Sequence, residues 1–108
     1  MSTSVSFAEV LQLRSDYPYA ELRLADALFA QGNLREAEMH YLAALRADPK
    51  LTIAYNNLGK VYLIQGQISQ ALVQFSEALR LNPGYKEAEE NLQTAKAADA
   101  QLFPAARR

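Results

Sequence analysis

The chain is short and nearly neutral: it has 108 residues, 50% of them hydrophobic, and 11 Lys and Arg against 12 Asp and Glu. So balanced a charge gives no broad attraction to phosphate backbones or anionic lipid, which argues against nucleic acid and membrane surfaces as partners. The absence of cysteine excludes disulfides, thiolate metal sites and cysteine nucleophiles.

The amino-terminal region predicts a helix and no export signal. It has neither a basic segment nor the apolar run of a secretory signal, and no stretch of the chain approaches the length of a bilayer span. We therefore expect a soluble, cytoplasmic protein. Ser6 followed by Glu9 fits a capping box, and Val5 with Val10 fits the staple around it, so we expect a first helix within residues 5–16.

Two copies of one 34-residue pattern follow, at residues 18–51 and 52–85. A period in this range indicates stacked repeats, in which each unit needs a neighbour to bury its apolar face. The identical pairs that align are Ala20/Ala54, Leu24/Leu58, Gln31/Gln65, Gly32/Gly66, Ala37/Ala71, Ala44/Ala78, Leu45/Leu79, Arg46/Arg80 and Pro49/Pro83.

Each unit is predicted to be two antiparallel helices, because its apolar residues recur at spacings of three and four. Gly32 and Gly66 are expected to close the first helix of each unit in a left-handed conformation. Pro49 and Pro83 end the second. Residues 86–101 continue the pattern for half a unit with a largely polar face, as a terminal capping helix does. We expect a single domain over 1–108, with a tail at 102–108.

The second unit carries a family signature at the correct mutual spacings: Tyr55, Leu58, Gly59, Tyr62, Gly66, Ala71, Phe75, Ala78 and Pro83. With these residues the chain resembles the tetratricopeptide repeat family over roughly residues 18–97. The first unit departs from the pattern at Glu21 and Leu28. The resemblance implies an all-α fold, a right-handed α-solenoid of antiparallel helix pairs with about six helices.

The resemblance also implies a function, since such repeats mostly bind peptides or proteins on the concave surface of their first helices. We therefore expect a protein-interaction module that needs no cofactor. Carried over by position, the expected contact residues are Tyr19, Leu22, Arg23, Asp26, Phe29, Ile53, Asn56, Asn57, Lys60, Leu63, Ile64 and Asn91.

Asn57 and Asn91 stand at equivalent positions one repeat apart. Because an amide donates and accepts at once, stacked asparagines are able to hold the main chain of an extended peptide. The alternative is two solvated asparagines without a ligand. The carboxylate clamp that a subclass of the family uses for chaperone tails is not expected, because Asp26 and Glu87 stand where that clamp carries cations.

Between Leu51 and Ser76 the only charged residue is Lys60. Either the middle unit is largely buried between its neighbours, or it presents an apolar ligand site or a self-association surface. A self-associating oligomeric scaffold and an accessory region of a larger protein are therefore retained as alternative functions.

Catalysis is not expected from this chain. His40 is the single histidine, and the glutamates that follow Lys86 lack a loop able to hold calcium. No phosphate loop, nucleophile elbow or zinc spacing is present, so we predict neither an enzyme nor a metal protein.

Overall fold

The computed structural model describes residues 17–102, which form five helices. They are α2 (Pro18–Ala30), α3 (Leu34–Ala47), α4 (Thr52–Ile64), α5 (Ile68–Leu81) and α6 (Lys86–Leu102). The all-α prediction is confirmed. Its count of about six is corrected to five for the described range. The helix expected within 5–16 and residues 103–108 of the tail expected at 102–108 lie outside this range, while Leu102 is the last residue of α6. None of the five helices is long and apolar enough to cross a membrane.

Glycine closes the first helix of each pair, as the sequence predicts. Gly32 and Gly66 have φ angles of 83° and 81°, in the left-handed region where glycine has no side chain to clash. Their N–H groups donate to the carbonyls of Phe29 at 2.9 Å and Leu63 at 3.1 Å. These bonds satisfy carbonyls that would otherwise be left without partners at the helix end, and they turn the chain back sharply.

The second helix of each pair ends two residues before proline, at Ala47 and Leu81. Asp48 and Asn82, which follow α3 and α5, have extended angles of φ −144°, ψ 94° and φ −141°, ψ 89°. A residue that precedes proline is excluded from helical geometry by the proline ring. The chain therefore leaves the helix at the same place in both repeats.

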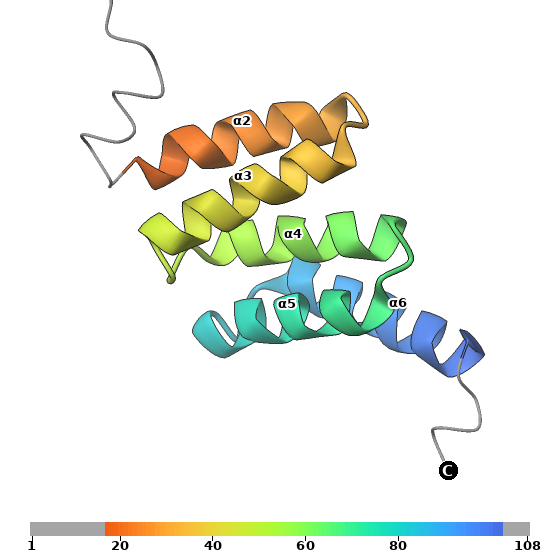
Figure 1. Cartoon of the computed structure of the whole chain (residues 1–108). Coiled ribbons are helices and arrows are strands. Elements are labelled where there is room, and N and C mark those ends of the chain that lie inside the picture. Colours follow the sequence, from red (N-terminus) through yellow and green to blue (C-terminus); the bar gives the residue numbers. More distant parts are fainter. Residues whose placement is uncertain (1–16, 103–108) are drawn as a thin grey trace, which may run out of the picture.

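Consecutive helices pack antiparallel and in chain order (Figure 1). Each helix contacts the next one, and in addition α2 contacts α4 and α4 contacts α6. The first helices α2, α4 and α6 thus form one layer, and the second helices α3 and α5 form the other. The layer of first helices is the surface on which the sequence places the contact residues.

The core consists of aromatic and aliphatic side chains set against very small ones. Tyr41, Phe75, Leu58 and Val61 are fully buried. Gly59 allows α4 and α5 to approach closely, since a Cβ at this position would lie 2.5 Å from Cε1 of the Phe75 ring. The alanines that are fully buried are Ala25, Ala37, Ala44, Ala54, Ala71, Ala78, Ala88 and Ala95.

Candidate interaction surface

One stripe of equivalent positions runs along each first helix, and we call the three stripes together the groove face. Positions spaced by four, three and four residues fall on the same side of an α-helix. The stripes are Tyr19, Arg23, Asp26 and Ala30 in α2; Ile53, Asn57, Lys60 and Ile64 in α4; and Glu87, Asn91, Thr94 and Ala98 in α6.

The predicted contact residues divide into three groups by exposure. Tyr19, Arg23, Asp26, Ile53 and Ile64 are exposed; Phe29, Asn57, Lys60, Leu63 and Asn91 are half-buried; Leu22 and Asn56 are buried. Ten of the twelve predicted residues are therefore at least partly open to solvent along the first helices.

Leu22 and Asn56 were predicted to contact a ligand at the surface, but both side chains are buried. Leu22 is 6% exposed and belongs to the hydrophobic core, while Asn56 is 0% exposed. They stand at the same repeat position, which the neighbouring elements cover in both units. Neither side chain is able to meet a ligand directly.

Asp26 forms the connection between α2 and α4. Its Oδ1 accepts the Tyr41 hydroxyl at 2.5 Å and Nδ2 of Asn57 at 3.0 Å. Burial, followed by the hydrogen bond to Asp26, raises the pKa of Tyr41 far above its ordinary value. The Tyr41 phenol therefore stays protonated, and its buried hydroxyl fixes the position of the Asp26 carboxylate in the groove face.

Buried Asn56 continues this network to α6. Its Nδ2 donates to Oδ1 of Asn57 at 3.4 Å, and its Oδ1 accepts Nδ2 of Asn91 at 2.9 Å. A buried amide is stable only when its polar atoms are paired, and here both ends are used. Asp26, Asn57, Asn56 and Asn91 thus form a hydrogen-bonded chain across all three first helices.

Lys60 makes the second connection between these helices. Its Nζ lies 3.1 Å from Oε2 of Glu87 and 5.6 Å from the centroid of the Phe29 ring. The hydrogen bond from Lys60 is the main cause that lowers the pKa of the Glu87 carboxyl. The cation is thereby shared between an acid of α6 and an aromatic ring of α2.

The hydrogen bonds of Asn57 and Asn91 within the protein affect whether these two amides could hold a peptide backbone. Each amide donates one of its two N–H groups within the protein. The internal bonds hold both side chains in fixed orientations, so any peptide would meet a preorganised pair.

Two tyrosines beneath the groove face were not predicted from the sequence to belong to the site. The hydroxyl of Tyr41 donates to Asp26. Tyr85 interacts with Asn56. Burial, followed by the charge of Glu87, raises the pKa of Tyr85, and the hydrogen bond with Asn56 opposes this increase. A signal was available for Tyr41, since the equivalent residue Phe75 has no hydroxyl. A hydroxyl present in only one of two matching core positions indicates a nearby polar partner.

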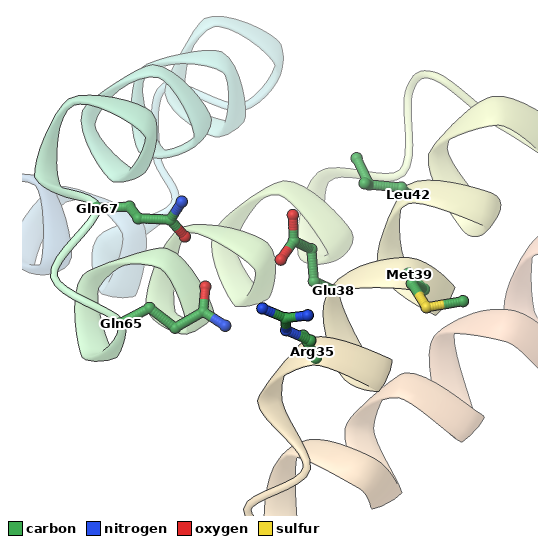
Figure 2. Close-up of a pocket in the computed structure, with 6 residues that line it drawn as sticks. All are labelled: Arg35, Glu38, Met39, Leu42, Gln65 and Gln67. Carbon is green, nitrogen blue, oxygen red and sulfur yellow. The ribbon is translucent and has the colours of Figure 1, made fainter.

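A separate hollow of about 620 Å³ lies between α3 and the turn that joins α4 to α5 (Figure 2). Its lining is Arg35, Glu38, Met39, Leu42, Gln65 and Gln67. Glu38 accepts the Tyr62 hydroxyl at 3.1 Å, and burial together with this carboxylate raises the pKa of Tyr62 to about 12. Oε1 of Gln65 is buried and lacks a hydrogen-bond partner. None of the lining residues was predicted as a site.

His40 has a partner on the neighbouring helix. Its Nδ1 lies 2.7 Å from Oε1 of Glu21, so the pair joins α3 to α2. Within residues 17–102 no group of three or more His, Cys, Asp or Glu side chains is placed to hold a metal ion. The geometry around His40 is that of a contact between helices.

The antiparallel pairs in register and the layer of first helices define a stacked helical-repeat domain. The sequence profile of the tetratricopeptide repeat family matches residues 22–86, more than half of the chain. The chain therefore belongs to the tetratricopeptide repeat family, whose domains are generally protein–protein interaction modules and typically non-catalytic.

The chain is also similar to human tetratricopeptide repeat protein 6. The two are 38% identical over 52 residues, which make up 48% of this chain and 10% of that protein. The chain thus spans a small part of the length of that relative.

Proposed function

We propose that the groove face binds an extended segment of a partner protein. The observation that carries this proposal is the row of exposed apolar side chains in repeat register: Tyr19 and Ile53 stand one repeat apart and are 63% and 48% exposed, and Ile64 is 62% exposed. Apolar side chains left in water beside fixed polar groups are typical of a binding surface.

The electrostatics favour a ligand segment that is apolar and weakly charged. Lys60 and Glu87 neutralise one another, and Asp26 is held by two neutral donors. A terminal carboxylate would meet the negative charge of Asp26 at a position where the carboxylate clamp carries a cation, and Lys60 is already paired with Glu87. Arg23 is the remaining cation of the groove face. A chaperone-type tail is accordingly a poor ligand for this surface, and a peptide ending in a free carboxylate should bind no more tightly than its amidated form.

The test begins with twelve-residue peptides selected from a displayed random library on the wild-type chain. Ile64→Glu should weaken the selected peptides at least about tenfold, since it places a charge in the apolar row. Val73→Glu is the matched control: Val73 is 61% exposed but lies on α5, in the other layer. We expect micromolar affinities, because so short a surface removes little area from water.

Two results would contradict the proposal. Equal weakening by Ile64→Glu and Val73→Glu would place the ligand away from the groove face, or show a general loss of folding that circular dichroism would detect. Unchanged binding in Ile64→Glu with normal helicity would remove α4 from the binding surface.

A further inference from the structure

Among the described residues 17–102, no helix covers the outward apolar face of α2, whereas α3 and α5 cover the equivalent faces of α4 and α6. In α4 this face is Ala54, Leu58 and Val61, all 0% exposed beneath α3. In α6, beneath α5, Ala88 and Ala95 are 0% exposed and Leu92 is half-buried. In α2 the same positions are Ala20 and Leu24, which are half-buried, and Ala27, which is exposed.

The opposite end of the stack needs no such cover. Glu89, Gln93 and Lys96 of α6 are exposed, at the positions that Tyr55, Gly59 and Tyr62 occupy in α4, where Gly59 lies against Phe75 of α5. A polar end is stable in water, as the end of a repeat array must be. In the part of the chain that the structure describes, these three positions offer no apolar complement to the α2 face of a second molecule, which argues against stacking of copies end to end.

The repeat register identifies a segment of this chain that fits the open face. Phe7, Val10 and Leu11 precede Tyr41, Ala44 and Leu45 by one repeat. In α3 those three residues are at most 9% exposed, and α3 is the helix that covers α4. The segment therefore carries, 34 residues earlier, the apolar pattern of a second helix.

The connection also has the required length. Residues 48–51 join α3 to α4, and residues 82–85 join α5 to α6. Residues 14–17 stand at the same place before α2, which begins at Pro18. A helix that ends at residue 13 would therefore be joined to α2 by four residues, the same number that joins α3 to α4 and α5 to α6.

We propose that residues 5–13 pack as a short helix on the Ala20, Leu24 and Ala27 face of α2, as α3 packs on α4. The occupant is the chain's own amino-terminal segment, and the contact buries Phe7, Val10 and Leu11. This surface is distinct from the groove face and closes the apolar end of the stack.

Hydrogen exchange of the full chain tests this. Amides of residues 8–13 should exchange at least about tenfold more slowly than in an unstructured peptide. Leu24→Asp on α2 and Leu11→Asp on the segment should each return these amides to the unstructured rate while α4 keeps its protection. Val73→Asp, an equivalent change on exposed α5 surface, should leave the segment protected.

Three outcomes would overturn the proposal. The first is exchange of residues 8–13 at the unstructured rate in the wild type. The second is protection that persists in Leu24→Asp or in Leu11→Asp. The third is protection that rises with protein concentration together with a dimer in sedimentation equilibrium, which would make a second copy the occupant.

Discussion

The first helix pair, α2 with α3, and the second, α4 with α5, share one register but hold their central aromatic residues differently. Tyr41 and Phe75 are equivalent, and both are 0% exposed. Phe75 lies against Gly59, with no room for a Cβ. At the position of Gly59 the first pair has Ala25, and Tyr41 there extends a hydroxyl to Asp26.

The difference shows that one repeat position serves two kinds of stabilisation. In the second pair the aromatic residue stabilises by close packing alone, which depends on shape. In the first pair it also fixes a polar group of the groove face, so its contribution depends on a hydrogen bond and on pH. Changes at equivalent positions should therefore have unequal effects.

Gly59→Ala should show the largest effect. The added methyl group would lie 2.5–2.9 Å from three atoms of a buried ring. Overpacking of this severity costs about 3 kcal/mol, and the roughly 1 kcal/mol by which alanine favours helix over glycine offsets part of it. We expect the free energy of unfolding, measured with urea, to fall by about 2 kcal/mol.

Two further variants sharpen that result. Phe75→Leu in the Gly59→Ala background should recover about 1 kcal/mol, because the smaller side chain makes room for the methyl group. Ala25→Gly in the first pair should cost only about 1 kcal/mol, mainly from helix propensity. If Gly59→Ala were as stable as the wild type, close packing would not distinguish the two pairs.

Tyr41→Phe tests the hydroxyl of the first pair. At neutral pH the lost hydrogen bond to Asp26 should cost about 1 kcal/mol, since Asp26 is exposed and regains water. The pKa of Tyr41 is raised in the folded state, so the stability it confers is present below the ordinary value of 10.0 and is lost as the pH rises above it. The variant should therefore lose less stability between about pH 9 and about pH 11 than the wild type does.

Asp26→Asn is the matched control for this pH dependence. It keeps an oxygen acceptor for Tyr41 but removes the negative charge, which contributes to the raised pKa. Its loss of stability at high pH should fall between those of the wild type and Tyr41→Phe. Identical pH profiles for the three proteins would mean that Tyr41 does not titrate with unfolding.

The smallest effect is expected at Lys60, which replaces Asp26 in the second unit. Lys60 and Glu87 are 36% and 50% exposed, so water screens their attraction and Lys60→Met should cost less than about 1 kcal/mol. The pKa of Glu87 is lowered in the folded state, so the pair stabilises the protein above pH 4.5 and loses that contribution as the pH falls below it.

Urea unfolding at neutral and acidic pH, at low and high salt, measures this contribution. The difference between wild type and Lys60→Met should shrink in acid and at high salt. A difference that persisted under both conditions would assign the role of Lys60 to its contact with Phe29 instead.

Much of the architecture follows from the sequence because it depends on local chemistry repeated at a fixed period. Gly32 and Gly66 close helices through their own backbone freedom, and Pro49 and Pro83 exclude the preceding residues from helices, whatever surrounds them. The apolar spacing then fixes which sides of the helices meet. These features determine the antiparallel pairs, their order and the layer that carries the groove face.

Only the tertiary structure decided which polar residues of that layer are available. Asn56 and Asn57 are adjacent and chemically identical, yet Asn56 is buried between two amides while Asn57 is only half-buried and donates to Asp26. The difference arises from neighbours 30 or more residues away, across helices that a periodic pattern places only approximately. Burial and hydrogen bonding are properties of such contacts, so the sequence determined the stack and the fold determined its exposed surface.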